Sequence, residues 1–200
     1  MLGICGGGGY ALNAALTEKR IKAVVGIAPV NLGRLFRESF SGFDPLGALQ
    51  AMAAQRTAEA RGGALRVDEL LPASPAEAAG LTDRDVAEAT EHCKTRRGAQ
   101  PGGATRMLFS HAQKALSWDA FAYAEMLMTQ PMMVVIGRKV GAFGACRDGS
   151  EIYGRATASA DRRMVELEDG SHDDLYDRPE PVGQAMAEIG PFLKRHLAAA

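Results

Sequence analysis

The stretch that decides the fold is Gly3-Ile4-Cys5-Gly6-Gly7. It joins a short apolar segment, Leu2-Gly3-Ile4, to an Ala-rich segment at 10–17 that predicts a helix. This order matches G-x-Nu-x-G, the nucleophile elbow, in which the nucleophile occupies a strained turn between a strand and a helix. We expect side chains at Gly3 and Gly7 to clash in so tight a turn, and the glycines at 6–9 to separate strand from helix.

A cysteine at this position is suited to attack a carbonyl group. The dipole of the following helix favours the thiolate of Cys5 and lowers the pKa of the thiol. The backbone N–H of Gly6 would point at the oxyanion that forms during attack. The plain alternative is a buried structural cysteine beside a glycine-rich turn.

The same glycines also match a relaxed dinucleotide-binding fingerprint, Gly6-x-Gly8-x-x-Ala11. That motif needs an acidic residue at the end of the second strand. The second apolar run instead ends Ile27-Ala28-Pro29-Val30-Asn31, which contains no acid, so this interpretation is weaker.

Further apolar runs predict a mainly parallel sheet with flanking helices, an α/β fold. The strands are expected at 2–4, 23–28, 132–136 and 164–168, and helices at 150–160 and from Pro181 onward, with an apolar face that includes Met186 and Leu197. Residues 1–34 and 129–200 would form this core. Residues 35–128 are rich in Ala, Glu and Arg and are expected to be a helical insertion, with helices at 45–61, from Ser74-Pro75, from Thr82 and at 107–127.

His172 is the candidate general base. It follows the last predicted strand in Gly170-Ser171-His172-Asp173-Asp174 and precedes the final helix, where a loop can bring an imidazole to the nucleophile. His92, His111 and His196 fall in predicted helices and are expected to be surface or packing residues.

The acid of a Cys–His–acid triad is not evident. The loop after the strand at 132–136 contains no carboxylate from Arg138 to Gly144. Asp148 and Glu151 are the nearest candidates, and of these Asp148 is the predicted acid; either could equally be a solvated residue near a helix start.

Composition limits the remaining classes of function. The chain has 200 residues, 46% of them hydrophobic, and a net charge of −1, with no cationic patch of the kind that binds nucleic acid. No apolar run is long enough for a membrane span, and Met1 leads straight into the elbow without a signal peptide. The three cysteines suggest neither a disulfide framework nor a zinc site, so we expect a cytoplasmic protein without metal or cofactor.

Three stretches together resemble the α/β-hydrolase superfamily, in its dienelactone-hydrolase-like branch of bacterial esterase- or peptidase-like proteins. They are the elbow and following helix at 2–15, the strand at 129–137, and the histidine loop at 169–180; the stretch at 94–98 is also similar. The resemblance implies that Cys5 is the nucleophile and His172 the base, and it puts Gly141 where the family has its acid.

The resemblance also implies strands and an oxyanion-hole loop ahead of the elbow, which this sequence does not contain. Two hypotheses are therefore open. The first is a hydrolase of carboxylic esters, thioesters or lactones, whose insertion shapes an apolar pocket for a small-molecule substrate. The second is a truncated or degenerate, non-catalytic relative. With the elbow strand at a sheet edge, we expect weak activity and either aggregation or a homodimer.

Overall fold

A four-stranded parallel sheet is the centre of the first of two compact units, which comprises Met1–Asn31 and Asp119–Ala200. In the computed structural model, which describes residues 1–40, 42–80, 83–103 and 105–198, the strands are β1 (Leu2–Ile4), β2 (Val24–Ile27), β5 (Met132–Gly137) and β6 (Arg162–Leu167). They pair in the order β1-β2-β5-β6, all parallel. The predicted parallel sheet is confirmed, with strand bounds within two residues of those expected.

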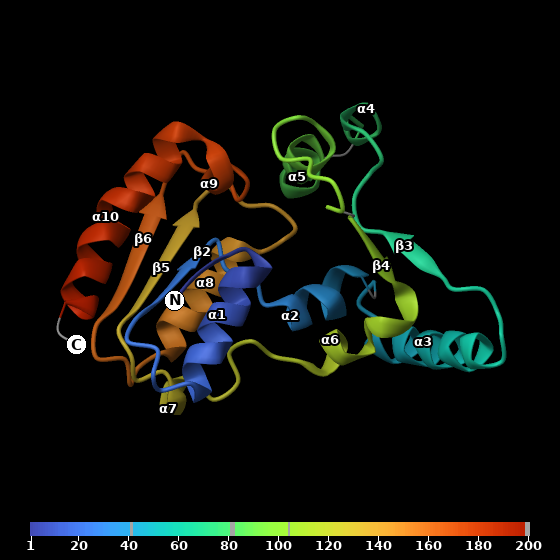
Figure 1. The fold of residues 1–200 in the computed structure, drawn as a ribbon, viewed down its shortest axis with the longest axis horizontal. Helices are drawn as coiled ribbons and strands as arrows, with labels where there is room; N and C mark the ends of the chain where they lie inside the picture. The colour runs from blue at the N-terminus through green and yellow to red at the C-terminus, as the bar shows by residue number, and fades with distance from the viewer. Residues whose placement is uncertain (41, 81–82, 104, 199–200) are drawn as a thin grey trace. The chain divides into compact units, whose positions relative to one another are not determined.

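Helices cover both faces of this sheet (Figure 1). α1 (Gly6–Thr17) and α8 (Ala145–Arg155) pack on one face, and α10 (Pro179–Leu197) packs on the other. Two short helices, α7 (Ala124–Leu127) and α9 (Asp174–Asp177), connect these elements. Every residue of β2 and β5 is buried, because helices remove both faces of the central strands from water. β6 is only partly buried, as predicted for a strand near the edge.

The glycines after Cys5 follow the end of β1, as predicted, but they belong to the first helix instead of separating it from the strand. α1 begins at Gly6. A Cβ on Gly8 would lie 3.0 Å from the Cα of Pro29, and one on Gly9 would lie 2.2 Å from the carbonyl oxygen of Val30. The first turns of α1 therefore rest directly on the backbone that follows β2, an approach that only glycine permits.

The helices of the core also differ from the sequence prediction in their bounds. α8 lies five residues earlier than the helix expected at 150–160. It contains Gly149, where a Cβ would lie 2.5 Å from Cγ2 of Ile136. The predicted apolar face of α10 is only partly correct. Ala185, Ile189 and Phe192 are buried, whereas Met186 and Leu197 are 49% and 51% exposed.

The second unit, Leu32–Trp118, is not wholly helical as predicted. Its helices are α2 (Leu32–Leu35), which continues as a π-helix (Phe36–Phe40), α3 (Pro45–Ala60), α4 (Pro75–Ala78), α5 (Arg84–Lys94), a 3₁₀ turn (Phe109–His111) and α6 (Gln113–Ser117). Its strands β3 (Val67–Glu69) and β4 (Arg106–Leu108) pair antiparallel. Three-residue strands joined by a long connection have no alternation long enough to be detected in a sequence.

Side-chain caps fix several helix starts in this unit. Asp44 accepts a hydrogen bond from the backbone N–H of Gly47 at 2.9 Å, and Ser74 accepts one from Glu77 at 3.3 Å, which confirms the predicted starts of α3 and α4. α5 is capped by Asp83, whose carboxylate accepts from the N–H of Val86 at 3.0 Å. Thr82, the cap expected from the sequence, lies outside the described residues.

The single helix predicted at 107–127 is wrong. Trp118 is extended, with φ −85° and ψ 146°, and Tyr123 has a left-handed backbone with φ 62°. The chain re-enters the first unit at Asp119, ten residues before the expected boundary.

Replacing Gly3 and Gly7 by alanine should have opposite effects on stability. A Cβ on Gly3 would lie 2.1 Å from the carbonyl oxygen of Gly7, whereas a Cβ on Gly7 meets nothing within 4 Å. The clash expected at Gly7 is therefore absent. Gly3→Ala should lower the free energy of unfolding by about 3 kcal/mol, and Gly7→Ala should raise it by about 0.5–1 kcal/mol. Urea denaturation followed by circular dichroism measures both; equal effects would contradict this account.

Candidate functional site

Cys5 occupies the turn between β1 and α1 with a strained backbone. Its φ and ψ are 54° and −128°, a conformation that costs a residue other than glycine about 1–3 kcal/mol. Backbone hydrogen bonds hold it there. The N–H of Cys5 donates to the carbonyl of Ile27 at 3.0 Å, and its own carbonyl accepts from the N–H groups of Gly8, Gly9 and Val30 at 2.9, 3.2 and 3.0 Å.

Gly6 is the first residue of α1, so its N–H belongs to the helix turn that has no intrahelical acceptor. It directly follows the half-buried side chain of Cys5. The two residues thus combine a thiol with a helix N-terminus at the end of β1. The roles expected from the sequence, Cys5 as nucleophile and Gly6 as oxyanion donor, stay predictions.

His172 lies in the segment between β6 and α9 and is 4% exposed. Two aromatic rings pack edge-on against its imidazole: Phe143, with ring centroids 5.2 Å apart, and Tyr176, with centroids 5.5 Å apart. The Nε2 atom lies 3.1 Å from the hydroxyl oxygen of Tyr176. Burial lowers the pKa of His172 to about 4, so the ring is neutral at neutral pH.

The other imidazole nitrogen of His172 has no hydrogen-bond partner. Nδ1 is buried and unsatisfied among the residues that the structure describes. In a Cys–His–acid triad a carboxylate would bind the nitrogen that faces away from the nucleophile. No such bond is present here, so the structure does not bring the predicted acid to the predicted base.

Asp148 is instead part of the packing of α8. Its side chain is fully buried, and Oδ2 accepts a hydrogen bond from the backbone N–H of Asn31 at 2.7 Å. The other candidate, Glu151, is bound to Arg155 at 3.0 Å. The structure thus gives no hydrogen bond between Nδ1 of His172 and either carboxylate, and a catalytic role for Asp148 stays a prediction.

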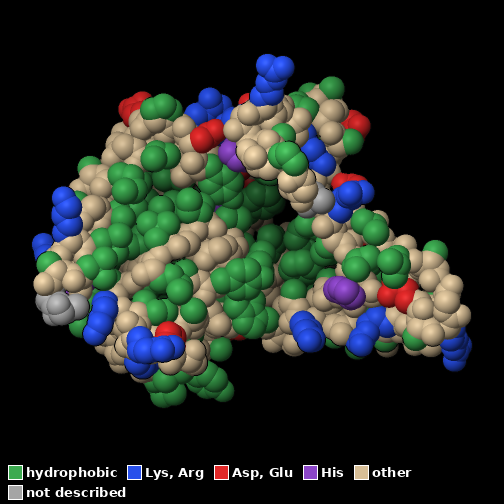
Figure 2. All heavy atoms as spheres, viewed as in Figure 1, with side chains coloured by type: hydrophobic (Ala, Val, Ile, Leu, Met, Phe, Trp, Pro, Cys, Tyr) green, Lys and Arg blue, Asp and Glu red, His purple; other side chains and the backbone are tan. Residues whose placement is uncertain are grey.

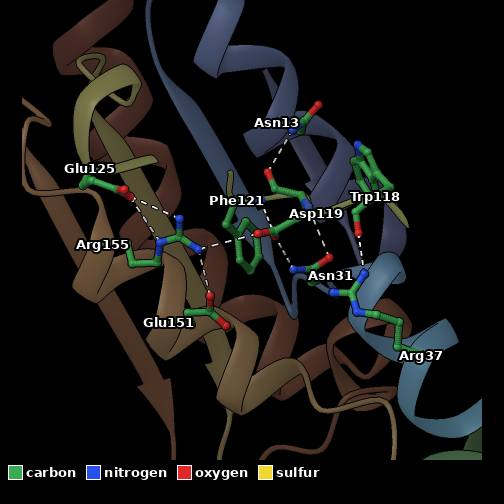
Figure 3. Close-up of polar contacts among 10 residues, drawn as sticks. Asn13, Asn31, Arg37, Trp118, Asp119, Phe121, Glu125, Glu151 and Arg155 are labelled. Atoms are coloured by element: carbon green, nitrogen blue, oxygen red, sulfur yellow. Dashed lines mark hydrogen bonds and ion pairs between the residues drawn. The ribbon is translucent and has the colours of Figure 1, made fainter. Parts of the chain in front are cut away.

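Asn31 connects three segments of the core (Figure 3). Its side-chain Nδ2 donates to Asp119 at 2.8 Å, and its Oδ1 accepts from the backbone N–H of Ala120 at 3.2 Å. Asn13 of α1 donates to the carbonyl of Ala120 at 3.0 Å. Arg155 of α8 forms a 3.8 Å ion pair with Asp119 and binds Glu125 of α7 at 3.2 Å. Nothing in the sequence indicated this role. There, the segment ending at Asn31 mattered only because it lacks the acidic residue that a dinucleotide-binding motif needs.

Tyr176 was not predicted from the sequence either. A signal was available, because residues four apart on a helical turn face each other and Tyr176 is four residues after His172. Two of the remaining histidines behave as expected. The Nε2 of His196 lies 3.0 Å from Asp161 on the surface of α10, and His92 packs against Gly98, where a Cβ would lie 2.3 Å from its Nε2.

Other site classes find no support in the described residues. They contain no cluster of three or more His, Cys, Asp or Glu side chains that could hold a metal ion. None of the described helices has the length and the apolar character needed to cross a bilayer. On the face shown in Figure 2 the Lys and Arg side chains are scattered, and several of them lie beside Asp or Glu side chains.

The inserted unit contains a pocket of its own. Its volume is about 120 Å³. Its lining is mixed, with the charged residues Arg66, Asp68 and Glu69 beside apolar ones, and the guanidinium of Arg66 lies over the ring of Phe109, 3.7 Å from the ring centroid. The apolar side chains lining it are Phe36, Phe40, Met52, Leu70, Met107, Phe109 and Leu116.

Comparison with known proteins identifies the fold. No family model matches the sequence. The uncharacterized protein YcjY of Escherichia coli (strain K12) is 30% identical over 200 residues, which cover 98% of this chain and 63% of YcjY. The crystal structure of the hypothetical protein PA2218 from Pseudomonas aeruginosa is 24% identical with a TM-score of 0.79, over 98% of this chain and 60% of that one.

A third similar protein has a stated class. The α/β-hydrolase GrgF from Penicillium sp. sh18 is 20% identical with a TM-score of 0.68, over 98% of this chain and 63% of GrgF. Lipolytic enzymes are among the other solved structures with this fold. The chain therefore carries part of the α/β-hydrolase fold, and it spans about three-fifths of the length of the proteins it matches.

The pH dependence of His172 is a direct consequence of its burial. The folded-state pKa is about 4 and the unfolded value is about 6.5, so between these values the unfolded chain binds a proton that the folded chain does not. The contribution of neutral His172 to the free energy of unfolding is therefore complete above pH 6.5 and is lost as the pH falls toward 4.

Two measurements check this. The imidazole ¹H resonances of His172, assigned by their loss in His172→Gln, should titrate with a midpoint near 4. The unfolding free energy of His172→Gln should fall less steeply between pH 6.5 and 4 than that of the wild type. A midpoint above 6 would contradict the burial.

Proposed function

We propose that the chain belongs to a hydrolase of carboxylic esters, thioesters or lactones in which Cys5 is the nucleophile and His172 the base. The observation that carries the proposal is the strained backbone of Cys5 at the start of α1. Backbone outliers of this kind persist where the surrounding structure enforces them, and they concentrate at active sites. The α/β-hydrolase fold and the elbow sequence support the same reaction class.

The topology supports the pairing of these two residues. β1 and β6 are parallel strands of one sheet, so Cys5 and the segment carrying His172 follow the same edge of that sheet. They are three strand spacings apart, about 14 Å at about 4.8 Å per spacing. The segment from 168 to 173 would bring the imidazole along this edge from β6 toward β1 and Cys5. The packing of His172 on Phe143 is in that direction, because Phe143 follows β5, the strand next to β6.

The proposed reaction proceeds in two steps. The sulfur of Cys5 bonds to the carbonyl carbon while its proton passes to His172, and the carbonyl π electrons move to oxygen, where the N–H of Gly6 donates a hydrogen bond. The C=O bond re-forms, the bond to the leaving atom breaks, and that atom (oxygen in an ester or lactone, sulfur in a thioester) takes the proton from His172. Water, deprotonated by the same imidazole, then hydrolyses the resulting thioester to the carboxylic acid and regenerates the thiol.

The substrate is a small acyl compound in this proposal. The similarity of the stretches at 2–15, 129–137 and 169–180 to the dienelactone-hydrolase-like branch favours a compact ester or lactone. The second candidate is a non-catalytic α/β-hydrolase-like protein. The absence of a carboxylate on Nδ1 of His172 among the described residues favours it.

Hydrolysis of p-nitrophenyl acetate and butyrate distinguishes the two candidates. Cys5→Ala should reduce kcat by at least about 10³-fold, as removal of a nucleophile does in other hydrolases. Cys93→Ala and Cys146→Ala are matched controls that remove a half-buried thiol elsewhere and should retain activity. Mass spectrometry of the quenched wild type should find the acyl group on Cys5. A chain that neither turns over these esters nor becomes acylated supports the non-catalytic alternative.

A further inference from the structure

The imidazole of His172 is held by a phenol. The hydroxyl of Tyr176 is 3.1 Å from Nε2, the two rings meet edge to face at 75°, and the residues are four apart along the turn that leads into α9. Phe143 covers another edge of the imidazole at an interplanar angle of 81°. The ring is thereby fixed in orientation, while Nδ1 has no partner among the described residues.

The two neutral forms of His172 differ in whether a ring nitrogen can accept a proton. If the hydroxyl of Tyr176 donates to Nε2, the ring proton is on Nδ1, and neither nitrogen has a free lone pair. If Nε2 carries the proton and donates to the oxygen of Tyr176, the lone pair of Nδ1 is free, because Nδ1 has no partner among the described residues. A role of His172 as a base therefore requires the second form.

We propose that Tyr176 is the positioning residue of His172: its phenol oxygen accepts a hydrogen bond from Nε2–H, and so leaves the lone pair of Nδ1 to take the proton of the nucleophile. This inference rests on the proposed function for its catalytic consequence. It assigns to a phenol the orienting role that a carboxylate has in a triad, with the two ring nitrogens exchanged.

The surroundings of His172 leave this role open for Tyr176. The loop from Arg138 to Gly144 has no carboxylate, and Oδ2 of Asp148 is bound to the amide of Asn31. A phenol fixes the tautomer and the ring plane as a carboxylate does, because both accept a hydrogen bond. A neutral phenol stabilises the imidazolium less than a carboxylate would, so the base is weaker but remains unprotonated over a wider range of pH.

Tyr176→Phe tests the proposal, because it keeps the ring packing and removes only the oxygen. Tyr153→Phe on α8 is the matched control. With p-nitrophenyl butyrate, Tyr176→Phe should lower kcat by about 10–100-fold, the range seen when a group that orients a ligating histidine is removed. KM should be nearly unchanged, since the hydroxyl does not bind substrate. The control should match the wild type.

The ¹⁵N spectrum of His172 gives a readout that does not depend on activity. In the wild type and in Tyr153→Phe the proton should be on Nε2, and in Tyr176→Phe the spectrum should change to a mixture of tautomers or to the Nδ1–H form. A proton on Nδ1 in the wild type, or an unchanged tautomer in Tyr176→Phe, overturns the proposal. If no chain hydrolyses the ester, the proposed function fails, and the ¹⁵N spectrum alone decides the role of Tyr176.

Discussion

The hydrogen bonds of Asn31 hold together the edge of the sheet on which the candidate site is built. Asn31 is 3% exposed and ends the segment after β2, where the chain leaves the first unit. Its backbone N–H binds Asp148 of α8, and its side chain binds Asp119 and Ala120, where the chain returns. One residue thus joins the exit of the chain, its return and a flanking helix, through its backbone and its side chain together.

This arrangement explains why a buried carboxylate near the site need not be catalytic. A fully buried Asp148 requires hydrogen bonds to offset the loss of water, and the amide of Asn31 supplies one at 2.7 Å. The sequence places Asp148 in the region where a triad acid is expected, but chain position does not show which buried donor a carboxylate will meet. The neutral state of His172 does not depend on Asp148. It follows from the burial of the imidazole between two aromatic rings.

The parts of the fold predicted from the sequence are those with a local cause. The buried strands were predicted because their residues are continuously apolar, and the starts of α3 and α4 because Pro45 and Ser74-Pro75 are typical of the first turn of a helix. The errors have a non-local cause. Gly9 was expected to lie between the strand and the helix, yet it lies inside the helix, where only glycine fits because the backbone of Val30 occupies the space of a Cβ. Tyr176 was missed for a related reason: its role depends on which nitrogen of His172 is left without a partner.

The geometry of the elbow is a property of the backbone rather than of the residues that would react. The carbonyl of Cys5 accepts from the N–H of Val30, and the next amide, that of Asn31, donates to Asp148. Ala28, between β2 and these amides, has its own positive φ of 41° and donates to the carbonyl of Val135. Main-chain hydrogen bonds thus hold both strained residues in place: Ala28 is bound to β5, and Cys5 is bound to α1. Replacement of the thiol, or loss of a carboxylate after β5, changes none of these bonds. Fold and chemistry are separable here, so it is acylation of Cys5, and not the fold, that identifies the reaction.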